Sequence, residues 1–280
     1  MNLVSDSPIL SIVGTTASGK SSIAMALARE IPNIEIVSID SMQIYKGMDI
    51  GTAKPSLEDQ REIPHHMIDL VEPDIEFSLS EFQRETVSAI RGIEERGAVP
   101  LLVGGTGLHL RAVIDNFEIP KQYPVVEREL DSEVDTVKLH KLLTQVDPVA
   151  AGRMENTNRR RILRALEVTL GSGRPFSSYG PGMQKYAPTR FHMVAPRWER
   201  EEINQRIDKR FDAQMEMGFF EEVCRLTESY GTLSRTARQA LGYRQFVDHL
   251  NGNISLDEAT DIAKRQTKKF ARRQERWFRR

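Results

Sequence analysis

The stretch GTTASGKSS, residues 14–22, constrains the fold of this 280-residue chain more than any other segment. It contains the pattern Gly-x-x-x-x-Gly-Lys-Ser, preceded by a short apolar run at 9–13 and followed by a segment with helical spacing at 22–30. Such a loop cradles phosphate oxygens with backbone N–H groups, and it needs a strand before it and a helix after it. The pattern therefore predicts an α/β fold that binds a diphosphate or triphosphate.

Further strand and helix signals follow in alternation. Residues 34–39 and 99–105 read as strands, and the capping-box pattern Ser78-x-x-Glu81 opens a helix that ends near Gly97. This order predicts a P-loop-type, doubly wound, mostly parallel sheet. The phosphate loop should then lie at the carboxyl end of the first strand, where such sheets bind ligands.

The pattern changes after about residue 115. The linker-like stretch NFEIPKQYP precedes helical segments, and TRFHMVAP at 189–196 reads as a strand that returns to the sheet. We therefore expect a core domain formed by 1–117 and 188–280, with a small helical insertion domain at 118–187. The core domain should end in C-terminal helices, with a helical segment at 199–230 and a last helix at about 257–280.

Charge is distributed unevenly along the chain. Residues 1–140 hold 12 Lys/Arg against 23 Asp/Glu, whereas residues 141–280 hold 27 against 17. A basic half indicates either a polyanion that docks on one side or solvated helix faces, and composition leaves both open. No apolar run reaches the roughly 18 residues that a membrane span needs. The lone cysteine and the absence of basic residues before the first apolar run predict a cytoplasmic protein, which we expect to be a monomer.

Three positions near the predicted loop can carry chemistry. Lys20 can place a full positive charge on a phosphate, and the Ser21 hydroxyl can bind Mg²⁺. Asp40 follows the second strand and can hold Mg²⁺ through water, cap the next turn or act as a general base. The third strand ends in Gly104-Gly105-Thr106-Gly107, where a nucleotide hydrolase would place an aspartate, and this argues against routine ATP splitting.

Several longer motifs carry a resemblance to a known family. GTTASGKS, IDSMQIYKGMDIGTAKP, PHHMIDL, LLVGGTGLHLRAV, RRILRALEV, ALGYRQF and ARRQERWFRR occur in order between residues 9 and 279. Together they resemble the tRNA dimethylallyltransferases, also called tRNA isopentenyltransferases. The chain departs from the family at Thr15, where proline is usual, and at His109, where tyrosine is common. A lone histidine there is expected to be a packing residue.

The resemblance implies transfer of a dimethylallyl group from dimethylallyl diphosphate to N6 of the adenosine at position 37 of certain tRNAs, with release of diphosphate. It implies Asp40 as the base, Thr106 as a group at the reacting oxygen and Lys20 as a stabiliser of the leaving group, with Mg²⁺ as cofactor. The implied diphosphate site also includes Arg206 and Arg210, for which a role as ordinary charged residues on one side of a helix is an equally good interpretation. Its members are Gly14, Thr15, Thr16, Ala17, Ser18, Gly19, Lys20, Ser21, Arg206 and Arg210.

Because the target base is stacked inside the anticodon arm, it must be turned out to react. The resemblance implies a set of tRNA-contacting residues in which Tyr243 supplies an aromatic ring for stacking and Arg128 is a candidate from the insertion. The set comprises Asp40, Ser41, Met42, Gln43, Thr106, Arg128, Arg160, Arg161, Arg164, Gln239, Gly242, Tyr243, Arg244, Arg272 and Arg273.

Three rival functions are compatible with a phosphate loop. An adenylate prenyltransferase would accept free AMP or ATP and would not need the arginine-rich segments. A small-molecule kinase would transfer label from ATP, whereas a prenyltransferase would transfer it from dimethylallyl diphosphate. An RNA-binding protein with an inactive loop would bind tRNA without modifying it. The sequence does not determine which tRNAs would be modified.

Overall fold

The computed structural model describes residues 7–180 and 188–278. The chain divides into two compact units, Met1–Ile114 with Thr189–Arg280 and Asp115–Pro188. The predicted boundaries at 117/118 and 187/188 lie within three residues of this division. Residues 181–187 of the predicted insertion and 279–280 of the predicted last helix lie outside the described residues.

The first unit is built on a five-stranded parallel sheet with strand order β3-β2-β4-β1-β5. Its strands are β1 (Ile9–Val13), β2 (Ile34–Ile39), β3 (His65–His66), β4 (Val99–Gly104) and β5 (Phe191–Val194). The expected α/β class and the four expected strands are confirmed. The strand β3 is not predicted from the sequence, because it has two residues and the alternation that marks a strand is read over about four to eight residues.

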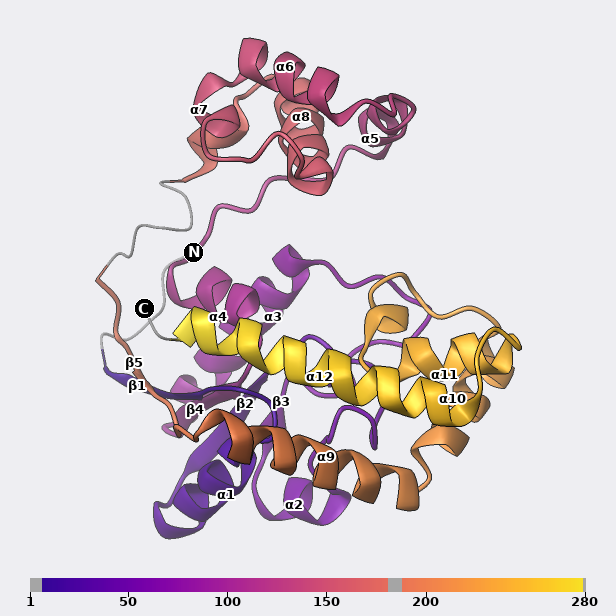
Figure 1. The fold of residues 1–280 in the computed structure, drawn as a ribbon. Coiled ribbons are helices and arrows are strands. Elements are labelled where there is room, and N and C mark those ends of the chain that lie inside the picture. The colour runs from indigo at the N-terminus through magenta and orange to yellow at the C-terminus, as the bar shows by residue number, and fades with distance from the viewer. Residues whose placement is uncertain (1–6, 181–187, 279–280) are drawn as a thin grey trace. The chain divides into compact units, whose positions relative to one another are not determined.

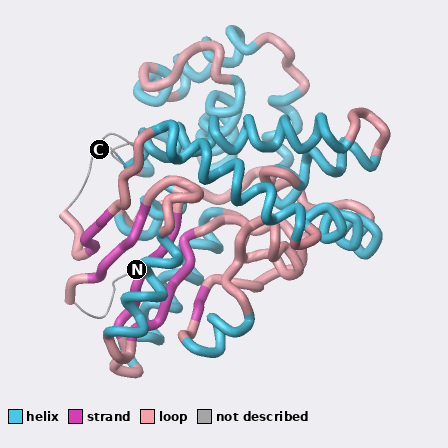
Figure 2. Tube along the Cα trace, turned by 60° about the horizontal axis from the view of Figure 1, so that its bottom comes forward, coloured by secondary structure: helices cyan, strands magenta, loops and turns pink. Residues whose placement is uncertain are grey.

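Helices cover both faces of this sheet (Figure 2). On one face, α1 (Lys20–Glu30) packs Ala24, Met25 and Ala28 against apolar side chains of β1, β2 and β4. The larger core on the other face includes α3 (Leu79–Glu95) and α4 (Gly107–Ile114). The predicted Ser78–Glu81 capping box opens α3 as expected. A short helix, α2 (Leu57–Glu62), lies between β2 and β3.

The C-terminal part of this unit is helical, with α9 (Arg200–Glu216), α10 (Phe219–Tyr230), α11 (Tyr243–Leu250) and α12 (Leu256–Phe278). Figure 1 shows α9 and α12 side by side, and two ion pairs between Lys and Asp side chains join them. The helical segment expected at 199–230 is confirmed and consists of two helices. Gly218, with φ +92°, breaks it into α9 and α10, because a left-handed residue cannot continue a helix.

The second unit consists of short helices around a small apolar core. They are α5 (Pro124–Asp131), α6 (Thr136–Val146), α7 (Pro148–Ala151) and α8 (Arg159–Ser172), followed by a 3₁₀ turn at Phe176–Tyr179. Leu139, Leu143, Ile162 and Leu166 form the centre of this core. No helix of the described residues has the length and apolar character needed to cross a membrane.

Candidate active site

The phosphate-loop sequence forms the turn between β1 and α1, at the carboxyl end of a central strand. Gly14 and Gly19 have φ values of +148° and +89°, which favour glycine, and Gly19 is the residue from which α1 starts. The Lys20 ammonium group donates a 2.6 Å hydrogen bond to the carbonyl oxygen of Thr15, so the loop closes on itself. The predicted strand, loop and helix are all present.

Asp40 follows β2 at the same edge of the sheet. One of its carboxylate oxygens accepts a 2.8 Å hydrogen bond from the backbone N–H of Met42, which fixes the orientation of the carboxylate. Burial raises the pKa of Asp40, while the N–H of Met42 and the charge of Lys20 act against that rise. A carboxylate with a raised pKa accepts a proton more readily than a solvated one does.

Two cations face this carboxylate. Burial lowers the pKa of Lys20 to about 8, and the charge of Asp40 opposes that change. Burial also lowers the pKa of Arg210 on α9, again opposed by Asp40. The three charged groups come from the start of α1, the residue after β2 and α9; the charge of Asp40 acts on the pKa of both cations, and both cations act on the pKa of Asp40.

Thr106 lies in the turn after β4, next to the end of β2. Its hydroxyl oxygen accepts a 3.5 Å hydrogen bond from the backbone N–H of Ser41. The preceding Gly104 is packed tightly, since a Cβ atom there would lie 2.2 Å from the carbonyl oxygen of Ile39. The ends of β1, β2 and β4 therefore bring together Lys20, Asp40 and Thr106, as the sequence predicts for residues at one sheet edge.

Two side chains near the start of α9 hold the outer side of the phosphate loop. The Arg206 guanidinium donates through Nε to the carbonyl oxygen of Ala17 at 2.9 Å, and Trp198 donates through Nε1 to that of Ser18 at 2.9 Å. The guanidinium also stacks 4.2 Å from the centre of the Trp198 ring. Sequence reasoning selected Arg206 and missed Trp198, because a lone aromatic residue before a helix gives no motif signal.

The loop at 49–51 is held by a buried carboxylate that sequence reasoning also missed. Glu222 on α10 accepts hydrogen bonds from the backbone N–H groups of Asp49, Ile50 and Gly51, at 2.7–3.2 Å. The Tyr243 hydroxyl donates to the same carboxylate at 2.6 Å. Glutamate side chains are common on exposed helix faces, so only the fold distinguishes this one.

Tyr243 is therefore a correction to the predicted tRNA contacts. Its side chain is fully buried, and its ring packs edge-on against Phe219 at 5.0 Å. A ring in this position cannot stack on a base. The adjacent Gly242, with φ +89°, is buried against the same phenylalanine and forms the turn into α11.

Other predicted tRNA contacts of this unit lie at or near the surface. Gln43 is half-buried, because its amide donates to the carbonyl oxygens of Thr52 and Ala53 and accepts from the Ser38 hydroxyl. Ser41 and Met42 are also half-buried, whereas the remaining members are exposed: Gln239, Arg244, Arg272 and Arg273. On α12, an exposed basic stripe recurs at helical spacing, formed by Arg265, Lys269, Arg272 and Arg276.

In the second unit the predicted arginines divide into two groups. Arg128, Arg160 and Arg161 are exposed. Arg164 is half-buried and bonded within the unit, to the buried carboxylate of Glu167 at 2.7 Å and to the carbonyl oxygens of Pro120 and Lys121. The geometry thus gives Arg164 a structural role in anchoring the segment before α5.

A metal ion at this site would be held mainly by phosphate oxygens of a bound substrate, because the described residues supply few metal ligands. Within 7–180 and 188–278 there is no group of three His, Cys, Asp or Glu side chains able to hold one. Ser21 is exposed in the first turn of α1, where its hydroxyl can reach an ion held by phosphate oxygens.

His109 is the packing residue that the sequence predicts. Burial lowers its pKa to about 4, so the ring is neutral, and it packs edge-on against Phe82 at 4.7 Å.

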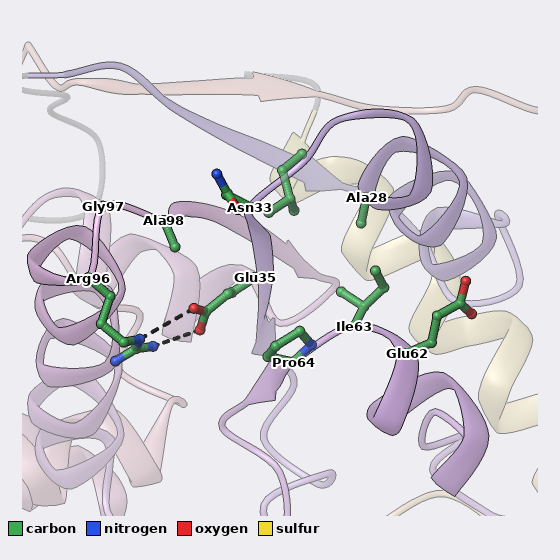
Figure 3. A pocket seen from close by; sticks show the side chains of 10 residues that line it. Ala28, Asn33, Glu35, Glu62, Ile63, Pro64, Arg96, Gly97 and Ala98 are labelled. Carbon is green, nitrogen blue, oxygen red and sulfur yellow. Dashed lines mark hydrogen bonds and ion pairs between the residues drawn. The ribbon is translucent and has the colours of Figure 1, made fainter.

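A shallow pocket of about 410 Å³ lies at the opposite edge of the sheet (Figure 3). Asn33 and Ala98, which line it, precede β2 and β4, so it is at the amino ends of the strands. Its charged groups are already paired, since Arg96 donates to the Glu35 carboxylate at 2.7 Å and Glu62 pairs with Arg29 at 2.6 Å. It contributes nothing to the phosphate-loop site.

Comparisons of the sequence with known proteins give the same family over most of the chain. A family model described as IPP transferase matches residues 43–280, and one described as isopentenyl transferase matches residues 8–69. The tRNA dimethylallyltransferase of Pelotomaculum thermopropionicum is 40% identical over 277 residues, which cover 98% of this chain and 88% of that protein. The corresponding protein of Carboxydothermus hydrogenoformans is 44% identical, with 97% and 89% covered.

Solved structures give the same result. The full-length tRNA isopentenylpyrophosphate transferase of Bacillus halodurans aligns with a TM-score of 0.69 and 37% identity, covering 97% of this chain and 86% of that one. A eukaryotic dimethylallyltransferase acting on tRNA aligns with a TM-score of 0.82 and 27% identity, covering 97% and 69%.

Proposed function

Because this chain belongs to the IPP transferase family, we propose that it transfers a dimethylallyl group from dimethylallyl diphosphate to N6 of a tRNA adenosine, at position 37. The observation that carries the proposal is the convergence of Lys20, Asp40 and Arg210 at the phosphate loop, with Thr106 beside them. This set provides cations for a diphosphate and a single carboxylate for a proton.

The chemistry requires both kinds of group. An adenine amine is a weak nucleophile, so its attack on the allylic carbon is assisted when a base removes the N6 proton. The new N–C bond forms while the allylic C–O bond breaks, and the electron pair of that bond leaves with the diphosphate. Asp40 receives the proton, and its raised pKa supports this role.

The leaving group gains negative charge as the bond breaks. Lys20, Arg206, Arg210 and the N–H groups of the loop stabilise that charge in a preorganised, partly buried site. Mg²⁺, held by diphosphate oxygens with the Ser21 hydroxyl as a protein ligand, would neutralise further charge on the diphosphate. Thr106 would hydrogen-bond at the reacting oxygen.

The tRNA would lie against basic surfaces. The stripe on α12 and exposed Arg244 support binding of the phosphate backbone by the first unit. Exposed Arg128, Arg160 and Arg161 support a contribution from the second unit. Apart from Arg128, these positions lie in the basic half of the sequence, residues 141–280.

A transfer assay tests the proposal. Unmodified tRNA and free AMP are offered together as acceptors with dimethylallyl diphosphate or ATP, each labelled in the group that would be transferred, and label should reach tRNA only from the prenyl donor. Label from ATP would support a kinase, and preferential labelling of free AMP would support an adenylate prenyltransferase. Asp40→Asn should lower the transfer rate by about 10²–10⁴-fold, while the affinity for tRNA changes little. Asp261→Asn, an exposed change on α12, serves as the matched control.

A further inference from the structure

Near its C-terminal end, α12 places one carboxamide between the phosphate loop and the turn after β4. The side-chain oxygen of Gln274 accepts a 2.8 Å hydrogen bond from the backbone N–H of Thr16. Its Nε2 donates a 2.8 Å hydrogen bond to the carbonyl oxygen of Gly105. The side chain is 5% exposed, and both ends of its amide are used.

The surrounding glycines fit this contact closely. A Cβ atom on Gly105 would lie 2.4 Å from Nε2 of Gln274 and 2.9 Å from the carbonyl oxygen of Gly14. One turn further along α12, Trp277 packs against Gly107, where a Cβ atom would lie 2.7 Å from the ring. The end of α12 is thus built against both active-site turns, with no space left for larger residues.

We propose that Gln274 is a positioning residue for the diphosphate, a role that rests on the function proposed above. It bonds the body of the phosphate loop to the turn that carries Thr106, although the two turns are about 90 residues apart in the sequence. The N–H groups of the loop can converge on a phosphate only if the loop keeps its curvature. Gln274 holds that curvature before the ligand arrives, so binding does not have to order the loop.

The position on α12 gives this contact a second consequence. The same helix carries the exposed stripe Arg265, Lys269, Arg272 and Arg276, on a different face from Gln274. One rigid element therefore contacts the donor site and presents the basic surface proposed for tRNA. A change at Gln274 should act on the diphosphate and leave the basic stripe in place.

Inorganic pyrophosphate is the probe, and its binding is measured by titration calorimetry. Gln274→Met keeps the length of the side chain and removes both hydrogen bonds, each of which is worth a factor of several in an equilibrium constant. We expect the dissociation constant for pyrophosphate to rise about 10-fold and the KM for dimethylallyl diphosphate to rise in parallel. The dissociation constant for tRNA should stay within twofold. Gln266→Met, on the same helix and half-buried, is the matched control.

The Gln274→Glu variant adds a second measurement, the pH dependence of pyrophosphate binding, which a purely structural role for Gln274 would leave unchanged. A protonated glutamate can donate to Gly105 and accept from Thr16, as glutamine does, whereas a carboxylate cannot donate and repels the diphosphate. Because position 274 is buried and the bound diphosphate is an anion, the pKa of a glutamate there should lie well above its ordinary value of about 4.3. The ratio of the variant's dissociation constant to that of the wild type should therefore approach 1 as the pH falls to 5.5 and rise at least 10-fold by pH 8. Recovery at low pH also shows that the variant is folded.

The outcomes separate this inference from the proposed function. Normal pyrophosphate binding by the wild type and by Gln274→Met alike would overturn the positioning role alone. A pH-independent ratio for Gln274→Glu would also overturn it. If the wild type itself does not bind pyrophosphate, the proposed function fails, and the positioning role fails with it.

Discussion

The buried hydroxyl of Tyr243 leads to a prediction that separates packing from tRNA stacking. Tyr243→Phe keeps the aromatic ring and removes one hydrogen bond to the Glu222 carboxylate. Burial raises the pKa of Tyr243, and the negative charge of Glu222 raises it further. The hydroxyl therefore stays protonated and donates its hydrogen bond throughout the working pH range. A buried hydrogen bond to a charged group contributes about 1.5–3 kcal/mol. The melting temperature should therefore fall by roughly 3–12 °C, at about 2–4 °C per kcal/mol.

The matched control is Tyr230→Phe. The Tyr230 hydroxyl also donates to a glutamate, Glu72, at 2.6 Å, but that carboxylate is 41% exposed. Interactions of this exposed kind are worth about 0–1 kcal/mol. Thermal unfolding of both variants and a double-mutant cycle with Glu222→Gln measure the difference.

A stacking role for Tyr243 makes the opposite prediction. Stacking needs the ring and not the hydroxyl, so Tyr243→Phe would then leave the melting temperature unchanged. Under either role the dissociation constant of Tyr243→Phe for tRNA, measured well below the melting temperature, should stay within twofold of the wild type, so the melting temperature is the discriminating measurement. An unchanged melting temperature for Tyr243→Phe would refute the packing assignment.

Two further predictions concern ligand binding. Because the pKa of Lys20 is about 8 and the ammonium form binds phosphate, the affinity for pyrophosphate should be greatest below pH 8 and fall as the pH rises through that value. Calorimetry between pH 7 and 10 measures this fall, and a Lys20→Met variant that keeps the full decline would contradict it. Replacing Arg272 and Arg276 by Gln should weaken tRNA binding and reduce the slope of log affinity against log salt by about 1–2. Filter binding from 50 to 200 mM salt measures that slope, and an unchanged slope would place tRNA elsewhere.

The sheet and the inner site are predictable because local signals specify them. The strand, phosphate loop and helix at 9–30 follow from one glycine pattern, and Asp40 and Thr106 are found because each follows a strand of a parallel sheet. The carboxyl ends of parallel strands meet at one edge, so three sequence positions are enough to place the centre of the site.

The side chains that hold the site are not predictable in this way. Trp198, Glu222 and Gln274 form hydrogen bonds with backbone atoms that lie 169 to 258 residues away in the sequence. A backbone carbonyl or N–H partner leaves no mark in the sequence, since every residue carries one. The motif around Tyr243 also does not distinguish an exposed stacking ring from a buried one, and only its burial in the fold reveals the packing role.

The packing at the end of β4 also explains why this phosphate loop is suited to a leaving group rather than to nucleotide hydrolysis. A hydrolase would need a carboxylate at the end of this strand, but the main chain at Gly104 and Gly105 lies too close to β2 and α12 for a side chain at either position. A Cβ atom on Gly104 would lie 2.2 Å from the carbonyl oxygen of Ile39, and one on Gly105 would meet Gln274. The carboxylate at this edge of the sheet is instead Asp40, the residue after β2, which accepts a hydrogen bond from the backbone N–H of Met42 and whose pKa is raised by burial and lowered by the charges of Lys20 and Arg210. In the proposed reaction Asp40 accepts the proton from the adenine N6 amine, while Gly104 lets the main chains of β4 and β2 approach closely.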